Sequence, residues 1–181
     1  VHVCLDIQSD DERIEWMVLE NQGFGIAVST GRNRNIEKHE LLGTEAVCLL
    51  PVSHRLASNE VISPEDLVGE NFISYFEGSI FKNDIDKAFN TAKVRRLTRY
   101  EGKTTGAIIG MVGAGLGVSI IDSGFGAGSF DPRCITIPFK PAIPYTAELL
   151  WSTQRDLSAI QNEFLNMVRE EYGDLHILSL I

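Results

Sequence analysis

The sequence contains few side chains that could hold a metal ion or act as a nucleophile. Its cysteines, Cys4, Cys48 and Cys134, are odd in number and widely spaced, which favours reduced thiols over a disulfide framework or a zinc site. The histidines form no close pair with one another, or with a cysteine at metal-ligand spacing: His2, His39, His54 and His176. We therefore expect neither a metal nor a cofactor.

The glycine-rich stretch from Gly113 to Gly117 is superficially similar to a dinucleotide-binding loop. It follows a predicted helix and precedes a predicted strand, whereas phosphate binding requires a loop that follows a strand and opens a helix. The sequence has no nucleophile elbow, no P-loop and no HExxH motif, although a triad assembled from distant residues stays open. These observations favour binding without catalysis and predict that the protein is not an enzyme.

The elements that must position any binding residues alternate between strand and helix. Alternating or continuous apolar residues predict strands over residues 1–7, 24–28, 45–50, 72–75, 95–100, 118–121, 133–138 and 145–151. Helical spacing predicts helices over 9–22, 79–92, 104–112 and 156–172, the last with Leu157, Ile160, Phe164 and Val168 facing inward. A polar stretch over 29–40 separates two of the predicted strands. This alternation predicts an α/β fold with mostly parallel sheets covered by helices.

The charge of the chain limits its partners. The formal net charge is −9 at pH 7, so most of the surface repels the phosphate backbone of nucleic acids. No apolar run approaches the roughly 20 residues of a membrane span, and the first residues lack the basic start and apolar stretch of a signal peptide. We therefore expect a cytoplasmic protein without membrane contact, in which any DNA contact comes from residues outside this chain.

Two stretches carry a family resemblance. The first reads PVSHRLA over 51–57, with ISPEDL over 62–67 and Phe72-Ile73 after it, and the second reads VGAGLGV over 112–118. In this order they resemble the signatures of the effector-binding domains of LysR-type transcriptional regulators, over nearly the whole chain. Residues 69–74, the helix around 81–89 and the Ile120-Ile121-Asp122 ending look closest to members that sense amino acids or their conjugates, such as lysine-biosynthesis and opine-catabolism regulators.

The resemblance implies a two-lobed fold like that of the type 2 periplasmic binding proteins. Mixed, mostly parallel sheets would be flanked by helices, with a ligand cleft between the lobes. The first lobe would take residues 1–70 and 146–181, and the second residues 71–145. Compared with the family, the chain would lack the N-terminal winged helix-turn-helix, the linker helix, and the first strand and helix of the first lobe.

In such folds, ligands lie at the carboxyl ends of parallel strands, where helix N-termini present backbone N–H groups. The candidate ligand-binding residues carry hydroxyl groups in the predicted strand-to-helix loops: Ser29, Thr30, Ser74, Tyr75, Ser79, Thr104 and Thr105. Thr104 and Thr105 stand where relatives often use a threonine. The alternative is that these serines and threonines only cap helices. Asp122 could pair with a ligand ammonium group.

The resemblance implies a domain that binds a small-molecule effector and thereby shifts its lobe and subunit arrangement to control transcription. The expected partners are the effector, other copies of the chain in a homodimer or homotetramer, and DNA only through the missing helix-turn-helix domain. RNA polymerase can be a partner of the full-length protein, and the predicted helix 9–22 is a candidate interface. Two alternatives stay open: a solute-binding protein of a transporter, and an enzyme on the same bilobal fold.

Overall fold

The computed structural model describes most of the chain: residues 2–5, 23–28, 34–125, 131–173 and 176–177. The predicted helix over 9–22 and the candidate residues Ser29 and Thr30 lie outside these ranges. Residues 2–5 are exposed and form no strand, because none of the described strands pairs with them. The strand predicted over 1–7 is therefore wrong for its described part.

Contacts between residues divide the chain into two compact units. Unit 1 comprises Val1–Thr44 and Thr146–Ile181, and unit 2 comprises Glu45–Tyr145. The strands β2 (Ile36–Pro51) and β7 (Pro144–Ser152) each contribute residues to both units. Residues 45–70 group with unit 2. The cause is that the second half of β2 pairs with strands of unit 2.

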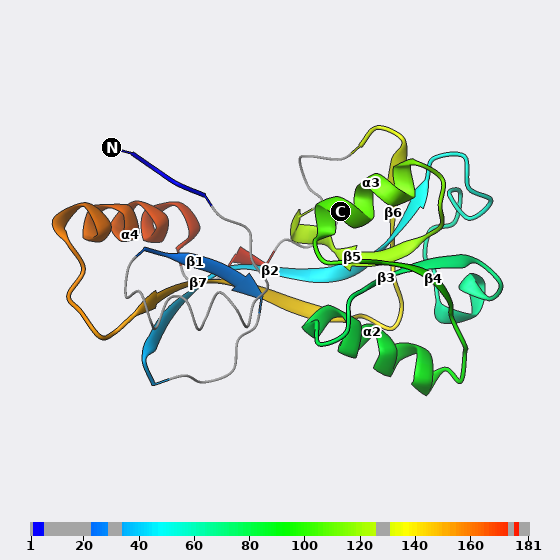
Figure 1. The fold of residues 1–181 in the computed structure, drawn as a ribbon, viewed down its shortest axis with the longest axis horizontal. Helices are drawn as coiled ribbons and strands as arrows, with labels where there is room; N and C mark the ends of the chain where they lie inside the picture. Colours follow the sequence, from blue (N-terminus) through cyan, green and yellow to red (C-terminus); the bar gives the residue numbers. More distant parts are fainter. Residues whose placement is uncertain (1, 6–22, 29–33, 126–130, 174–175, 178–181) are drawn as a thin grey trace. The chain divides into compact units, whose positions relative to one another are not determined.

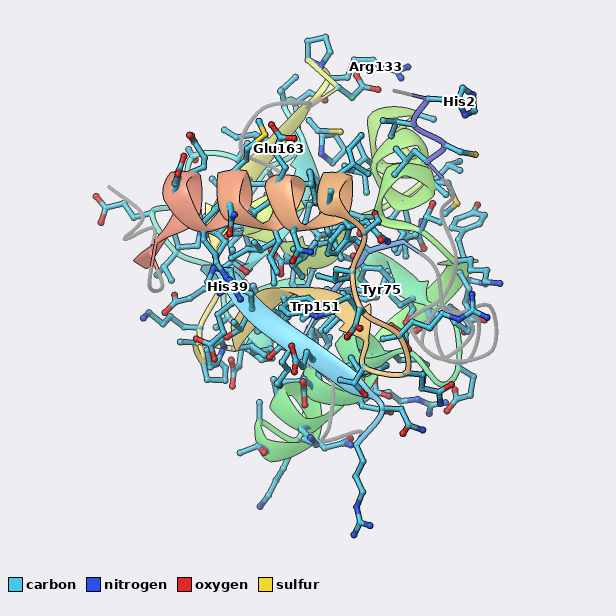
Figure 2. The ribbon with its side chains drawn as sticks, turned by 90° about the vertical axis from the view of Figure 1, so that its left-hand side faces the viewer. His2, His39, Tyr75, Arg133, Trp151 and Glu163 are labelled. Atoms are coloured by element: carbon cyan, nitrogen blue, oxygen red, sulfur yellow. The ribbon has the colours of Figure 1, made fainter. Side chains whose placement is uncertain are left out.

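Unit 1 joins three further elements to β2 and β7: β1 (Gly25–Val28), β8 (His176–Ile177) and the helix α4 (Ala159–Tyr172). β1 runs antiparallel to β7, and β8 runs parallel to β2. Figure 2 shows α4, which carries Glu163, lying beside the strands that carry His39 and Trp151. The core between them contains Leu41, Leu149, Trp151 and Leu165.

The inward face of α4 differs from the predicted one. Ile160 is 51% exposed, so its predicted inward position is wrong, whereas Val168 packs against the core as predicted. Phe164 is 43% exposed, although its ring contacts Phe24, and Leu165 is the buried residue of the helix. Leu157 does pack against the core, but it precedes Ser158, the residue that caps the helix. The helical period therefore cannot be counted from Leu157, and the buried face is rotated relative to the expected one.

The first part of β2 lies in the polar stretch over residues 29–40, to which the sequence pattern assigned no element. Lys38 Nζ donates a hydrogen bond to Glu148 Oε1 on β7 at 2.6 Å, and the Glu148 side chain is only 4% exposed. Opposite charges on neighbouring strands attract each other, and such pairs stabilise charged residues within a sheet. β2 ends at Pro51, where the sequence predicts that the regular strand stops.

Unit 2 contains the second half of β2 with two further strands of a six-stranded sheet, and a separate two-stranded parallel sheet. The strands β5 (Ser119–Asp122) and β6 (Cys134–Pro138) run antiparallel to β2, while β3 (Asn71–Tyr75) and β4 (Leu97–Gly102) pair in parallel. The helices α2 (Ile80–Thr91) and α3 (Thr105–Gly113) lie on opposite sides of β3 and β4 (Figure 1). The α/β class is confirmed, and antiparallel pairing is more frequent than expected because β2 runs against both of its neighbours in this unit.

The packing of the two helices follows the sequence pattern closely. The apolar residues that recur at helical spacing in α2, namely Phe81, Ile85, Ala88 and Phe89, are all buried. On α3, Ile108 and Val112 are fully buried. The short 3₁₀ helices η1 (Pro64–Leu67) and η2 (Ser123–Phe125) complete the unit, and η1 begins with the proline that favours a helical first turn.

The first signature stretch builds a network around Glu70. Arg55 Nε donates to Glu70 Oε1 at 2.8 Å, and His54 Nε2 lies 3.1 Å from Glu70 Oε2. Because Leu56 N donates to His54 Nδ1 at 3.3 Å, Nδ1 is an acceptor and Nε2 carries the proton that faces Glu70. Burial opposes ionisation of Glu70, but the hydrogen bonds from His54 and Arg55 hold its pKa below the ordinary value. The signature therefore fixes the segment that leads into β3.

The second signature stretch connects the end of α3 to the next strand. Gly115 has a φ of 76°, in the left-handed region that glycine adopts readily, and Leu116 N donates to Met111 O at 3.1 Å. A Cβ atom at Gly117 would lie 2.2 Å from the carbonyl oxygen of Asn71, so only glycine fits there. This close approach lets Val118 N donate to Asn71 O at 2.9 Å. The glycines thus join β5 to β3.

Candidate functional site

The carboxyl ends of three strands meet at one edge of unit 2, which we call the carboxyl edge. β3 and β4 run parallel and end at Tyr75 and Gly102, which are register partners. A parallel bridge between Phe72 and Val118 aligns β3 with the chain that enters β5, and β5 ends at Asp122. Loops at such edges are the usual ligand positions in α/β folds. The candidate residues of β3, β4 and their following loops are therefore brought together.

A hydrogen bond links two of the predicted residues across this edge. Tyr75 Oη and Thr105 Oγ1 are 2.8 Å apart, and either hydroxyl can donate. Tyr75 is buried and Thr105 is half-buried. Burial raises the pKa of Tyr75, and the nearby charge of Asp122 raises it further, so the phenol is neutral. After one hydrogen bond between two hydroxyls, one O–H donor and several lone pairs remain available to a ligand.

Thr104 caps a helix, as the alternative interpretation of these serines and threonines predicted. It is the N-cap of α3, with φ −124° and ψ 150°, and its Oγ1 accepts a hydrogen bond from Ala107 N at 3.2 Å. Its side chain is exposed. Just before it, a Cβ atom at Gly102 would lie 2.7 Å from Ile108 Cγ1, so the end of β4 approaches the first turn of α3 closely. Thr104 therefore fixes the start of the helix that carries Thr105.

The loop after β3 places its two serines differently. Ser74 is buried within β3 next to Tyr75. Ser79 stands at the N-cap position of α2, but its hydroxyl makes no capping hydrogen bond, and Asn83 N donates to the Ser79 carbonyl at 3.2 Å. A serine at an N-cap normally satisfies one of the free N–H groups of the first turn. The Ser79 hydroxyl is thus not used for the structural role that most often explains such a serine.

Asp122 is a buried acid at the end of β5, with 1% of its surface exposed. Its Oδ1 accepts a hydrogen bond from Gly124 N in the turn that follows. The carboxylate also acts electrostatically on Tyr75. The carboxyl edge therefore combines hydroxyl groups with one buried carboxylate.

Sequence reasoning missed two aromatic residues beside this edge, Phe81 and Tyr145. The ring of Phe81 stacks on Tyr75, with centroids 5.0 Å apart, and also contacts Tyr145, with centroids 4.7 Å apart. The Tyr145 hydroxyl is buried and has no hydrogen-bond partner among the described residues. In the sequence, Phe81 lies in a predicted helix and Tyr145 in a predicted strand, and no local pattern indicates that the two rings meet.

Other parts of the described chain do not match the predicted site. Unit 1 has an open hollow of about 380 Å³ between residues that include Trp151, Arg155 and Arg169, and none of the predicted ligand residues within the described ranges lines it. Within the described ranges, His, Cys, Asp and Glu form no group of three that could hold a metal ion. In the same ranges, no helix has the length and apolar character needed to cross a membrane.

Comparison with known proteins identifies the family. The model of the LysR substrate binding domain matches residues 1–173. The chain belongs to this family. The two signature stretches therefore have a structural explanation within the LysR family: one fixes the segment before β3, and the other joins β5 to β3.

Relatives with known roles are transcriptional regulators. The chain is 28% identical over 150 residues to the transcriptional activator protein LysR of Escherichia coli, covering 83% of this chain and 48% of LysR. It is also 28% identical over 165 residues to the regulatory protein NocR of Agrobacterium tumefaciens, covering 91% of this chain and 55% of NocR. The chain thus spans about half the length of these relatives.

A solved structure supports the fold assignment. The regulatory domain of CcmR from Synechocystis PCC6803, in complex with 2-PG, superposes with a TM-score of 0.81 at 17% identity, covering 97% of this chain and 86% of the CcmR chain. At this identity the likeness concerns the fold, which is that of LysR-type effector-binding domains.

Proposed function

We propose that this chain is the effector-binding part of a LysR-type transcriptional regulator and that it senses a small metabolite without transforming it. The effector would be an amino acid or an amino-acid derivative. Its binding would bias an equilibrium between arrangements of the two lobes and of the subunits, and so alter the contacts of the regulator with DNA.

The observation that carries this proposal is the carboxyl edge of unit 2. Three strand ends and the N-termini of α2 and α3 come together there, and the Tyr75–Thr105 pair presents hydroxyl groups at 2.8 Å from each other. Helix N-termini and fixed hydroxyls are suited to orienting a small polar ligand. The Ser79 hydroxyl, which makes no capping bond, is a further candidate contact.

The partners and the location follow from the family rather than from the site. We propose a cytoplasmic regulator that assembles as a homodimer or homotetramer and reaches DNA through a helix-turn-helix domain outside this chain, with RNA polymerase as a further contact. The regulator is favoured over the solute-binding protein of a transporter because the relatives LysR and NocR are described as regulatory proteins. An enzyme on the same fold would need a nucleophile hydrogen-bonded to a base, whereas the Thr105 hydroxyl is bonded to the neutral phenol of Tyr75.

A thermal-shift screen followed by calorimetry tests the proposal. The 181-residue chain is screened against amino acids, opine-like conjugates, small carboxylates and aromatic acids, and each mixture is analysed by mass spectrometry. A ligand that binds only the native state at 100 times its Kd adds about 2.7 kcal/mol to the free energy of unfolding. For a chain of this size, that corresponds to a rise in Tm of about 5–11 °C.

A matched pair of variants localises the binding. Thr105→Val removes the hydroxyl at the carboxyl edge, and Thr136→Val makes the same change at a half-buried threonine in β6. We expect affinity to fall about tenfold in the first variant, the loss of one hydrogen bond, and to stay unchanged in the second. Conversion of any compound by the wild-type chain would contradict the sensor role. Equal affinity of the wild type and Thr105→Val would contradict the placement of the effector at the carboxyl edge.

A further inference from the structure

The strand β4 and its flanks concentrate positive charge in an acidic chain. Residues 93–103 contain five lysines and arginines and one acid, a net charge of +4, whereas the whole chain has a net charge of −9. Arg96 is held inside unit 2, with its guanidinium carbon 4.8 and 4.7 Å from the ring centroids of Phe72 and Phe89. The other four basic residues are exposed: Lys93, Arg95, Arg99 and Lys103. The first three of these form no ion pair in the described part of the chain.

β4 also exposes two apolar side chains on one face of its sheet. Leu97 and Tyr100 are each 40% exposed, and their register partners Asn71 and Ile73 are alternate residues of β3. The pairing shifts by one residue between these positions, so Arg99 has no partner on β3. No described strand pairs with the outer edge of β4. Charges and bulges protect such edges from aggregation, but arginine beside exposed tyrosine and leucine is also typical of a protein interface.

The helix α4 presents the complementary combination. Ile160, Phe164 and Met167 are 51%, 43% and 62% exposed, and their helical spacing places them in one stripe. Arg169 lies on the other side of the helix, where it lines the hollow of unit 1 with Leu165. Three exposed glutamates lie along the stripe and form no ion pair in the described part of the chain: Glu163, Glu170 and Glu171.

Each of these surfaces is given a name by its residues. The basic face consists of Lys93, Arg95, Leu97, Arg99 and Tyr100. The acidic face consists of Ile160, Glu163, Phe164, Met167, Glu170 and Glu171. Both combine exposed apolar residues with charges that have no partner in the described part of the chain, and the charges are of opposite sign.

We infer that the basic face of one copy of this chain docks on the acidic face of a second copy. A second copy is the occupant because the chain itself carries the complement of its own basic face. Docking pairs the charges of the two faces and removes their apolar residues from water. In a two-fold dimer, each copy contributes both faces. The inference rests on the homodimer or homotetramer of the proposed function and identifies its contact surfaces.

The test measures self-association of the 181-residue chain by sedimentation velocity over a series of concentrations. Salt is kept at about 0.15 M, where the Debye length is about 8 Å, so repulsion between the acidic copies is largely screened. The basic-face variant is Arg95→Glu/Arg99→Glu, and the acidic-face variant is Glu163→Arg/Glu170→Arg. A matched pair of single substitutions compares Arg99→Glu with Lys140→Glu, an exposed lysine outside both faces.

We expect the wild type to associate and each double variant to associate at least about tenfold more weakly, because every reversal replaces an attraction by a repulsion. A mixture of the two double variants should associate like the wild type, since each reversed face then meets the opposite charge. Arg99→Glu should weaken association, whereas Lys140→Glu should not. The substituted side chains are exposed, so the Tm of the variants should stay close to that of the wild type.

Net charge alone gives a different pattern. The basic-face variant makes the chain more acidic and the acidic-face variant makes it less acidic, so an effect of overall repulsion would weaken association in the first and strengthen it in the second. That result would overturn the inference. Failure of the mixture to associate better than either variant would also overturn it, while self-association of the wild type would stand.

A monomeric wild type at every concentration would overturn both the inference and the proposed self-assembly, and effector binding measured by calorimetry would be unaffected. Fluorescence anisotropy with a labelled DNA duplex covers the other occupant of a basic surface. Binding of the duplex by a monomeric wild type, but not by the basic-face variant, would assign this face to a phosphate backbone and overturn the docking of a second copy.

Discussion

The hydrogen bond between Tyr75 and Thr105 gives a quantitative test of the carboxyl edge. Thr105→Val leaves the buried Tyr75 hydroxyl without its partner, and an unsatisfied buried hydroxyl costs about 1–3 kcal/mol. Tyr75→Phe leaves the Thr105 hydroxyl, which is half-buried and can turn to water, so the cost is that of one net hydrogen bond, about 0.5–1.5 kcal/mol. The two variants should therefore differ, with Thr105→Val the less stable.

The double variant decides whether the two hydroxyls act on each other. Because both polar groups are then removed, its free energy of unfolding should lie close to that of Tyr75→Phe alone, giving a coupling energy of about 1 kcal/mol or more. Urea unfolding of the wild type, the two single variants and the double variant measures this coupling. On the thermal scale, Thr105→Val should lower the Tm by about 2–12 °C. Additive effects of the two substitutions would refute the hydrogen bond and the alignment of β3 with α3 that it implies.

The remaining predictions concern the two family signatures. Gly117→Ala should destabilise the chain by about 1–3 kcal/mol or more, because the new Cβ would lie 2.2 Å from Asn71 O. Gly110→Ala should instead stabilise α3 by up to about 1 kcal/mol, because no atom lies within 4 Å of the new Cβ. Urea unfolding of both variants measures the two changes in unfolding free energy. The pKa of Glu70 is lowered in the folded chain, so its contribution to stability is complete above the ordinary value of 4.5 and is lost as the pH falls below it. The difference in unfolding free energy between wild type and Glu70→Gln should therefore shrink between about pH 6 and about pH 3, and a constant difference would contradict the pairing of Glu70 with His54.

Local patterns in the sequence were sufficient to predict the elements whose structure depends on residues close to them in the chain. The four buried residues of α2 recur at helical spacing, and Thr104 precedes its helix as an N-cap residue. Elements that depend on distant partners were not predictable in the same way. The first half of β2 is a strand partly because Lys38 meets Glu148, 110 positions along the chain, and the buried face of α4 is set by its fit to β2 and β7.

The candidate site was likewise predictable from the sequence only in part. Thr105 and Tyr75 were predictable because hydroxyl-bearing residues after strands of an α/β fold collect at one edge. That Thr104 serves as a cap while the Ser79 hydroxyl does not is a matter of side-chain rotation, which the sequence does not record. The unpaired hydroxyl of Tyr145 depends on the packing of β7 against the first turn of α2, so no sequence pattern marks it.

A crystal structure of the chain with the tightest-binding metabolite from the screen tests the assigned effector site. We expect the unaltered compound to lie at the carboxyl edge of unit 2, with polar atoms within hydrogen-bond distance of the Thr105 and Tyr75 hydroxyls. Electron density for a chemically altered compound, or for the compound in the hollow of unit 1 near Trp151 and Arg169, would contradict it.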